Sequence, residues 1–449
     1  MARKVARSSS GSTSYQELIE KIRTKKAKAG VVGLGYVGLP LAVELTHAGF
    51  NVTGFDIAPN KVKLLNSGKS DIDDVPDAEV KGMVSAGKFC ATTDFKLLGQ
   101  MDTISICVPT PLSKTKDPDV SFILTAVNSV KAHLKRGALV VLESTTYPGT
   151  TEELILPLLE ENGFKVGKDF FLAFSPERVD PGNQRFTTKN TPRVVGGVTP
   201  ECTKVAKAFY EQTIPDIYAV SSTQAAEMVK LLENTFRSVN IGLVNEVALM
   251  CDRLGLNVWE IIDAAATKPF CFMPFYPGPG LGGHCIPIYP HYLSWKLKSL
   301  NYYARFIELA GDINSSMPEY VVERASQIVS DRFSKALNKA SIVVLGMAYK
   351  ANIKDVRESP ALDVIKLLED HGAKVVFNDP YVDSIDWEGE RRKSTKLTAE
   401  LLQKADLVVI VTNHAKFDYP WIVEHAKAVF DTRNACRAVK TNRKKIEVL

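Results

Sequence analysis

Residues 29–56 read AGVVGLGYVGLPLAVELTHAGFNVTGFD, and they specify the architecture of the first part of the chain. A short apolar segment leads into a G-x-G-x-x-G loop at Gly33, Gly35 and Gly38. Residues 39–47 predict an amphipathic helix, and residues 51–55 predict a second strand that ends at Asp56. Three such glycines occur by chance in turns, but a strand, a glycine loop, a helix and an acid-terminated strand in this order indicate a dinucleotide-binding unit.

Each part of this loop has a predicted role toward a dinucleotide. Gly33 permits the tight turn, Gly35 lets the backbone approach a pyrophosphate, and Gly38 lets the helix pack closely on the strand. The pyrophosphate then lies at a helix N-terminus, where the N–H groups favour negative charge. Asp56 would accept a hydrogen bond from a ribose 2′-hydroxyl, which favours NAD, whereas the nearby Lys61 would favour NADP. The residues expected at the cofactor are Gly33, Leu34, Gly35, Tyr36, Val37, Gly38, Asp56 and Lys61.

Further strand and helix segments follow the first unit. Apolar segments 102–108, 138–142 and 170–174 predict buried strands, and residues 119–134 predict a helix, which favours a parallel, doubly wound sheet. Polar residues that follow such strands face the ligand crevice, although each taken singly could be a turn or capping residue. The residues in this position are Thr110, Ser144, Thr145, Glu177 and Arg178.

From about residue 221 the apolar period changes to 3.6, which predicts a helix of about 30 residues. A helix of this length suggests a spine between domains or a dimer interface. Glu227, Lys230 and Asn234 share a second face, which is either a solvated, ion-pairing face or one that directs a lysine and an asparagine into the crevice. The apolar stripe consists of Ala225, Val229, Leu232, Phe236, Val239, Leu243, Val247 and Met250.

Residues 340–440 repeat the pattern of the opening segment. Residues 341–350 predict a strand and a turn, 360–368 a helix, and 372–379 a second strand with its acid. The glycine loop is degenerate, so a second dinucleotide is not required. Lys350, Asp355, Arg357 and Glu358 lie in the first loop, and Arg433 follows a later strand. Cations in these positions suit a nucleotide diphosphate.

The predicted fold class is therefore α/β, with two Rossmann-like, doubly wound parallel-sheet domains joined by a long helix. The expected regions are a polar N-terminal arm with one short amphipathic piece (1–28), an NAD-binding domain (29–217), a central helical domain (218–325) and a C-terminal Rossmann-like domain (326–449).

Residues 276–285 form a loop that contains Gly278, Gly280, Gly282 and Gly283 and that ends at Cys285. So many glycines and prolines exclude helix and strand, and they allow the backbone to approach a ligand closely. A helix is predicted to start near residue 292. A thiol just before a helix lies where N–H groups favour the thiolate, although a buried structural cysteine is the commoner case.

The composition is that of a globular protein with more than one domain. The chain has 449 residues, of which 45% are apolar and 24% charged, and its net charge is +5. Its basic runs lack interleaved aromatic residues, so no nucleic-acid partner is expected. The seven cysteines are scattered without a C-x-x-C pair, so we expect no disulfide framework and no metal site, and a cytoplasmic location. No leader and no membrane-spanning segment are predicted.

Several motifs together resemble the UDP-glucose/GDP-mannose dehydrogenase family over roughly residues 29–437. The segment Lys268 to Pro287 most resembles the branch of UDP-N-acetylglucosamine 6-dehydrogenases, with the UDP-N-acetylmannosamine and UDP-glucose dehydrogenases as the nearest alternatives. The motifs are 33-GLGYVGLP-40, 107-CVPTP-111, 144-ST-145, 175-SPER-178, 230-KLLEN-234, 282-GGHC-285 and 348-AYK-350 with 357-RES-359.

This resemblance implies a four-electron oxidation of C6 of a UDP-sugar by two NAD, in a pathway to polysaccharide precursors. Cys285 would form a thiohemiacetal and then a thioester, and Glu177 would be the general base for its hydrolysis. Lys230 and Asn234 would stabilise the anionic oxygen, and Thr145 would position a water or the substrate hydroxyl. Further implied cofactor contacts are Pro109, Thr110, Ser144, Thr145 and Arg357. Implied substrate contacts are Glu177, Arg178, Lys230, Asn234, Tyr276, Gly278, Gly280, Gly282, Tyr349, Lys350 and Arg433.

One position departs from the family pattern. Four residues after the cysteine the family usually has an aspartate, and this chain has Tyr289, whose phenol carries no charge at neutral pH. One alternative is therefore a nucleotide-sugar binder that is impaired in turnover. Another is a 2-hydroxyacid or 6-phosphogluconate-type dehydrogenase, which would have no use for the cysteine or for the last domain. The resemblance also implies a homodimer.

Overall fold

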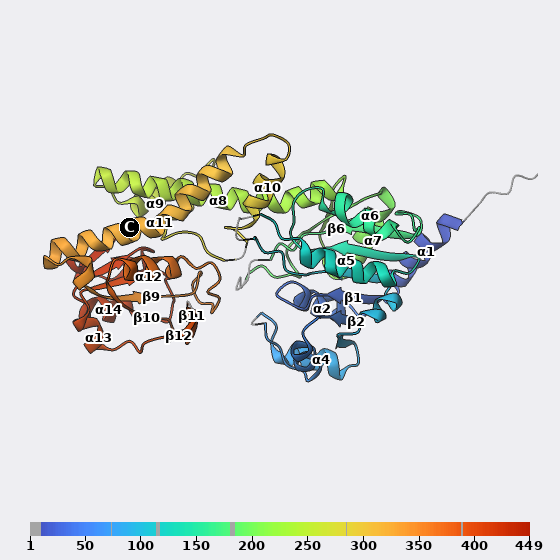
Figure 1. The fold of residues 1–449 in the computed structure, drawn as a ribbon, viewed down its shortest axis with the longest axis horizontal. Coiled ribbons are helices and arrows are strands. Elements are labelled where there is room, and N and C mark those ends of the chain that lie inside the picture. Colours follow the sequence, from blue (N-terminus) through green and yellow to red (C-terminus); the bar gives the residue numbers. More distant parts are fainter. Residues whose placement is uncertain (1–9, 73, 114–116, 180–184, 284, 388) are drawn as a thin grey trace, which may run out of the picture. The chain divides into compact units, whose positions relative to one another are not determined.

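The computed structural model describes residues 10–72, 74–113, 117–179, 185–283, 285–387 and 389–449. The chain divides within one long helix into two compact units, Met1–Leu232 and Glu233–Leu449. Each unit contains a largely parallel sheet with helices around it, as Figure 1 shows. The predicted fold class is confirmed.

The sheet of the first unit has the strand order β3-β2-β1-β4-β5-β6-β7-β8. Its first six positions follow the order of a dinucleotide-binding sheet, and only β6 and β7 pair antiparallel. The strands are β1 (Lys28–Val32), β2 (Asn51–Phe55), β3 (Phe89–Thr92), β4 (Thr103–Ile106), β5 (Ala138–Leu142), β6 (Phe170–Phe174), β7 (Arg193–Gly197) and β8 (Ile217–Ala219).

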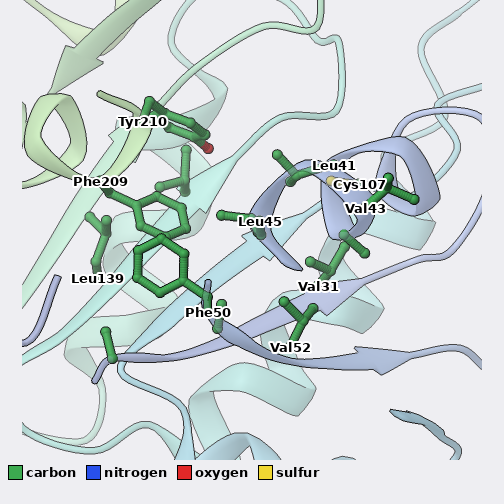
Figure 2. Packing of buried hydrophobic residues seen from close by; sticks show 14 of the residues in the cluster. Val31, Leu41, Val43, Leu45, Phe50, Val52, Cys107, Leu139, Phe209 and Tyr210 are labelled. Carbon is green, nitrogen blue, oxygen red and sulfur yellow. The ribbon is translucent and has the colours of Figure 1, made fainter. Parts of the chain in front are cut away.

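Both faces of this sheet are covered, as its apolar strands require. Successive residues point to opposite faces, so that Val31 and Val32 belong to different clusters of buried side chains. In the first cluster the rings of Phe50 and Phe209 meet edge to face at 5.7 Å (Figure 2). The covering helices are α2 (Gly38–His47), α3 (Pro59–Asn66), α4 (Asp77–Ser85), α5 (Ser121–His133), α6 (Leu156–Glu160) and α7 (Pro200–Tyr210), with a 3-10 helix η1 (Phe95–Gln100) and a π-helical turn η2 (Thr151–Ile155).

The structure describes the predicted N-terminal arm from residue 10 onward, and this part contains the amphipathic piece. Residues Ser10–Arg23 form helix α1, which packs against α7. Leu18 and Ile22 are fully buried in the core of the first unit, and Tyr15 meets the ring of Phe171 at 6.0 Å. The apolar side chains of α1 therefore anchor residues 10–23 to the first unit.

A group of helices follows the first sheet, and the longest confirms the predicted long helix. Helix α8 (Thr223–Leu254) buries Val244, Ala248 and Cys251 against α9 (Val258–Ala266). The predicted apolar stripe is exposed at Phe236 and Leu243. The remaining helices here are α10 (Tyr289–Lys298) and α11 (Arg305–Phe333), which runs alongside α12 (Pro360–Asp370) of the second unit (Figure 1). The region predicted as a separate central domain, 218–325, lies on both sides of the division between the two units.

The second unit repeats the strand and helix arrangement of the first. Its parallel sheet has the order β10-β9-β13-β14-β15, and alternate residues of β9 again enter clusters on opposite faces. The strands are β9 (Ser341–Leu345), β10 (Lys374–Asn378), β13 (Leu407–Ile410), β14 (Val429–Asp431) and β15 (Ile446–Val448), with a separate hairpin of β11 (Ser384–Trp387) and β12 (Glu390–Lys393). The helices are α12 (Pro360–Asp370), α13 (Ala399–Lys404) and α14 (Tyr419–His425), with short 3-10 turns η3 (Leu337–Lys339), η4 (Ala435–Ala438) and η5 (Arg443–Lys445).

Candidate active site

The glycine loop after β1 has the geometry that its sequence predicts. Gly33 has a φ of +89°, and a Cβ there would come within 2.7 Å of the carbonyl oxygen of Cys107. A Cβ at Gly38 would overlap the carbonyl oxygen of Gly33. At Gly35, in contrast, a Cβ would meet no atom of the described residues within 4 Å. The space beside Gly35 therefore fits a pyrophosphate at the start of α2, where a backbone N–H can reach it.

Asp56 lies immediately after β2 and next to this loop. Its Oδ2 accepts a hydrogen bond from the N–H of Leu34 at 3.1 Å, and its Oδ1 accepts one from Ala58 at 3.0 Å. Lys61 pairs with Asp71 at 3.0 Å and donates to the carbonyl oxygen of Leu34 at 3.3 Å. The cation that could have favoured a 2′-phosphate thus already has an acidic partner, and the residues here fit NAD. The side chain of Leu34 is buried in the core, whereas that of Tyr36 is exposed.

The polar residues predicted at the carboxyl ends of β4 and β5 lie close together. Ser144 donates from Oγ to the carbonyl oxygen of Val108 at 2.8 Å, which ties the two strand ends to each other. Thr110 and Thr145 are buried, whereas Pro109 is exposed. These side chains line the edge of the sheet at which doubly wound folds bind their ligands.

Glu177 follows β6 at the same edge. Its Oε1 accepts hydrogen bonds from the N–H groups of Arg178 and Val179 at 2.7 and 2.9 Å. Its Oε2 lies 4.0 Å from Nη1 of Arg193, and its side chain keeps 16% of its surface exposed. The guanidinium of Arg178 donates to the carbonyl oxygen of Pro192 at 2.7 Å.

Sequence reasoning did not identify Arg193, Glu143 or Tyr210 as parts of this site. The Arg193 side chain is only 3% exposed and forms an ion pair with the fully buried Glu143. Its Nε donates to Oγ of Ser175 at 2.8 Å, and its guanidinium lies 4.1 Å from the ring centroid of Tyr210. The Tyr210 hydroxyl donates to Oε1 of Glu143 at 2.5 Å. An arginine at the first position of a short apolar strand is the one local signal of this cluster.

Glu227, on α8, connects this helix to the loop after β5. Its carboxylate accepts from the N–H of Gly149 at 2.6 Å and from both the N–H and the hydroxyl of Thr151. Burial raises the pKa of Glu227 to about 7, because desolvation outweighs these hydrogen bonds. Glu227 thus binds the segment that continues from Thr145. Lys230 and Asn234 are both buried and lie one helical turn apart on α8.

Cys285 lies just before α10, as predicted, but the helix begins at Tyr289 rather than near residue 292. The carbonyl oxygen of Cys285 accepts from the N–H of Tyr289 at 2.9 Å, and the thiol residue is partly exposed. Tyr289 is 7% exposed, with its ring tilted against Tyr292 at 5.8 Å.

The glycine-rich loop before Cys285 is attached to the carboxyl edge of the second sheet. The N–H of Gly283 donates to the carbonyl oxygen of Arg357 at 3.0 Å, and Gly283 has a φ of +85°. A Cβ at Gly282 would come within 2.6 Å of Cβ of Tyr349, and one at Gly278 would overlap the guanidinium of Arg433. This backbone therefore lies close to protein atoms, and these atoms belong to Tyr349 and Arg433, which were predicted to bind the nucleotide; its approach to a ligand stays a prediction.

The start of the same loop is held by two asparagines that sequence reasoning also missed. Oδ1 of Asn245 accepts from the N–H of Gly278 at 3.0 Å, and its amide donates to Oδ1 of Asn314 at 2.8 Å. Asn314 in turn donates to the carbonyl oxygen of Ser238 at 3.1 Å. Tyr276 is directed toward α9, where its hydroxyl donates to Asp263 at 2.7 Å. Gly280 packs on Pro360.

Arg433 presents the clearest cation at the second sheet edge. It follows β14, and its Nε donates to the carbonyl oxygen of Val411 at 3.0 Å. Desolvation lowers the pKa of Arg433 to about 10, so it stays charged at neutral pH. Within the described parts of the chain no carboxylate forms an ion pair with its guanidinium, which suits a phosphate. Lys350 follows β9 at this edge, whereas Arg357 pairs with Asp355 at 2.6 Å.

The described residues give no indication of a metal centre or of a membrane segment. Among them, no cluster of three or more His, Cys, Asp or Glu side chains could hold a metal ion. None of the described helices combines the length and the apolar composition that crossing a membrane requires.

Comparison with known proteins assigns a family to every part of this arrangement. The NAD binding domain of the UDP-glucose/GDP-mannose dehydrogenase family matches residues 27–214, its central domain residues 224–316, and its UDP binding domain residues 343–438.

Individual relatives agree with this assignment. The UDP-N-acetyl-D-mannosamine dehydrogenase of Pyrococcus horikoshii is 37% identical over 87% of this chain and 90% of its own length. The UDP-N-acetyl-D-glucosamine 6-dehydrogenase of Pseudomonas aeruginosa is 36% identical over 81% of this chain and 85% of its own. A solved structure of the UDP-D-ManNAc dehydrogenase from Pyrococcus horikoshii covers 92% of this chain and 96% of its own, with 35% identity and a TM-score of 0.83.

Proposed function

Given that this chain belongs to the UDP-glucose/GDP-mannose dehydrogenase family and is an NAD-dependent nucleotide-sugar dehydrogenase, we propose that it oxidises C6 of UDP-N-acetylglucosamine to the uronate. The observation that supports this most is the attachment of the Cys285 loop to the edge of the second sheet that carries Arg433. It brings a partly exposed thiol and a cation suited to a diphosphate into one assembly.

The proposed chemistry uses the thiol to retain the intermediate. Bound NAD supplies the hydride acceptor, one molecule for each of two transfers. After the first transfer, the Cys285 thiolate adds to the C6 aldehyde and forms a thiohemiacetal, which loses the second hydride and becomes a thioester. One water then hydrolyses the thioester to the carboxylate and releases the thiol. Glu177 takes the proton of this water, and its partly exposed carboxylate suits that role.

The remaining site residues have supporting roles in this proposal. Lys230 and Asn234, buried on one face of α8, stabilise the anionic oxygen at C6, and Thr145 orients the hydroxyl or the water. Lys350 and Arg433 bind the diphosphate. We assign residues 29–217 to cofactor binding, 218–325 to the central helical region and 326–449 to UDP-sugar binding.

The test measures NADH formation at 340 nm with NAD and each of UDP-N-acetylglucosamine, UDP-N-acetylmannosamine, UDP-glucose and GDP-mannose. We expect turnover of UDP-N-acetylglucosamine above the others, two NADH per sugar, and loss of this turnover in Cys285→Ser with UDP-sugar binding retained. Full turnover by Cys285→Ser would refute the covalent route, and a preference for another sugar would correct the substrate.

One observation favours a second candidate function, a nucleotide-sugar binder with impaired turnover. Tyr289 is buried beside the thiol segment, where the family usually places a carboxylate. Absence of NADH with every sugar, together with tight UDP-sugar binding by calorimetry, would establish this alternative.

We also propose a cytoplasmic homodimer. On α8, Phe236, Leu243 and Met250 are 46, 54 and 49% exposed, and an apolar surface of this kind marks an interface. The seven cysteines are all free thiols, which suits a reducing compartment. A monomer mass by light scattering at micromolar concentration would refute the dimer.

A further inference from the structure

We infer that Arg193 is a positioning residue for Glu177, held in place by Glu143, Ser175 and Tyr210. This inference rests on the proposed function, in which Glu177 is the general base. It concerns residues of the first unit alone and assigns a task to a buried ion pair that the proposed reaction does not itself use.

The topology explains why an arginine from β7 can reach this edge. Strand β7 runs antiparallel to β6, with Ala173 opposite Gly197 and Phe174 opposite Gly196. The first residue of β7 therefore lies beside the carboxyl ends of the parallel strands, where the ligand crevice is. Glu143 follows β5 and Ser175 follows β6, so Arg193 joins the ends of two neighbouring strands.

Arg193 and the backbone together fix the carboxylate of Glu177. Two N–H groups bind its Oε1, which leaves Oε2 facing Nη1 of Arg193 at 4.0 Å. This separation is too long for a hydrogen bond, so the lone pairs of Oε2 remain available for a proton. It is short enough for the guanidinium charge to set the orientation of the carboxylate. The hydrogen bond from Arg193 to Ser175 also fixes the point at which the chain leaves β6 toward Glu177.

The buried partners keep Arg193 in this position. A guanidinium removed from water needs a permanent counter-charge, and Glu143 provides it. Tyr210 covers one face of the guanidinium and donates to Glu143. Burial and the Glu143 carboxylate both raise the pKa of Tyr210, so that its phenol keeps the proton that it donates. Two neighbouring acids thus have different tasks, because Glu143 anchors the arginine and Glu177 stays open to water.

The experiment compares four variants in full-length protein by intact-mass analysis and steady-state kinetics. Glu177→Gln should accumulate the acyl adduct on Cys285, because hydrolysis is slowed. Arg193→Lys keeps the charge and loses the planar fork, and it should accumulate the same adduct. Its kcat should fall about tenfold or more, with KM for both substrates nearly unchanged, since general-base catalysis contributes about 10²–10⁴-fold. Tyr210→Phe should give the same effect to a smaller extent.

Arg136→Met is the matched control. Arg136 forms an ion pair with Asp169 at the amino ends of β5 and β6, the two strands whose carboxyl ends Arg193 joins. The Arg136 side chain is exposed to solvent. Arg136→Met should accumulate no adduct and keep its kcat.

The outcomes separate the inference from the function on which it rests. An adduct in Glu177→Gln but none in Arg193→Lys or Tyr210→Phe overturns the inference alone. A tenfold or greater fall in the rate of the first-turnover NADH burst in Arg193→Lys also overturns it, because a purely structural residue would slow hydride transfer as well as hydrolysis. No adduct in Glu177→Gln refutes the proposed chemistry itself, and the inference fails with it.

Discussion

The Oδ2 atom of Asp379 lies 2.9 Å from Nε2 of His414, and neither side chain is exposed to solvent. Asp379 follows β10 as Asp56 follows β2, and the two acids accept from equivalent residues, Met347 and Leu34. Each acid also accepts from the N–H two residues later, Ala58 or Tyr381. The difference is that Asp379 accepts in addition from the N–H groups of Ala348 and Val382 and lies against His414. Its oxygens are thus fully used, and the second sheet has lost the acid that a dinucleotide ribose requires.

We therefore predict one dinucleotide site per chain. Fluorescence titration with NADH should give a stoichiometry of one per chain, and Asp56→Ala should abolish tight binding. Asp379→Asn is the matched variant in the duplicated position, and it should leave NADH affinity within about twofold, because the acid there holds protein groups. Two NADH per chain in the parent protein would contradict this prediction.

The glycine loop of the first unit predicts opposite effects for two similar substitutions. Gly35→Ala should weaken NADH binding without changing the free energy of unfolding, because its Cβ enters the open space beside the loop. Gly38→Ala should destabilise the protein by about 1–3 kcal/mol or more, because its Cβ overlaps backbone that cannot move away. Thermal melts and NADH titrations of both variants test this, with Gly82→Ala in the open interior of α4 as the control that should keep NADH affinity and gain about 0.5–1 kcal/mol of stability. Equal effects from Gly35→Ala and Gly38→Ala would refute it.

A substitution in the glycine-rich loop before Cys285 should change KM for the UDP-sugar and leave KM for NAD unchanged. At Gly278 an added Cβ would overlap Nη1 of Arg433, which is the far end of a flexible side chain. Gly278→Ala should therefore displace the guanidinium rather than unfold the loop. We expect KM for the UDP-sugar to rise about tenfold, the value of one charged hydrogen bond of about 1.5 kcal/mol, with KM for NAD unchanged. Arg433→Lys should behave in the same way, and an unchanged KM in both variants would remove Arg433 from the nucleotide site.

Glu227 predicts how stability depends on pH. Its folded pKa of about 7 exceeds the ordinary value of 4.5, so the folded state holds the proton more tightly than the unfolded state. The free energy of unfolding contributed by this group therefore falls as pH rises from 4.5 to 7, by about 3 kcal/mol at most. Urea unfolding of the parent and of Glu227→Gln over this range should show that the variant loses this decline.

The pH dependence that Asp379 contributes to the free energy of unfolding has the opposite sign to that of Glu227. Asp379 therefore serves as an internal comparison. Desolvation by burial opposes ionisation, but hydrogen bonds from His414 and backbone N–H groups hold the pKa of Asp379 below its ordinary 3.8. Its contribution is present above that value and is lost as pH falls through the lower folded pKa. Asp379→Asn should accordingly lower the free energy of unfolding by a constant amount across pH 4.5–7, leave its slope there as in the parent, and differ less from the parent in strong acid. A pH-dependent decline that persists in Glu227→Gln would show that another group causes it.

The parts of the site that the sequence predicts are those whose partners are close along the chain. The roles of Gly33, Gly35 and Gly38 follow from a local strand, turn and helix, and the structure reproduces each geometry. Arg193 and Glu143 are 50 residues apart, and Asn245 and Asn314 are 69 apart. Because such pairs meet only through strand order and helix packing, no local pattern indicates them. The exposed apolar stripe on α8 is a further example. The period of 3.6 residues predicts which side chains share one face of the helix, but it does not predict whether other residues cover that face.

Tyr289 provides the sharpest test of whether this chain is impaired. Tyr289→Asp would place a carboxylate in the first turn of α10, where the helix dipole favours it by about 0.3–1 kcal/mol. The lost burial of the ring against Tyr292 is larger, so the variant should be less stable by about 2–4 kcal/mol. If the phenol limits turnover, kcat for NADH formation should nevertheless rise severalfold. Tyr289→Asn removes the same ring without adding charge, and it should lose stability with no gain in kcat. Equal kcat in the parent and in Tyr289→Asp would mean that another group already supplies what the aspartate gives its relatives. An equal gain in kcat in Tyr289→Asp and Tyr289→Asn would show that the bulk of the ring, and not the missing charge, limits turnover.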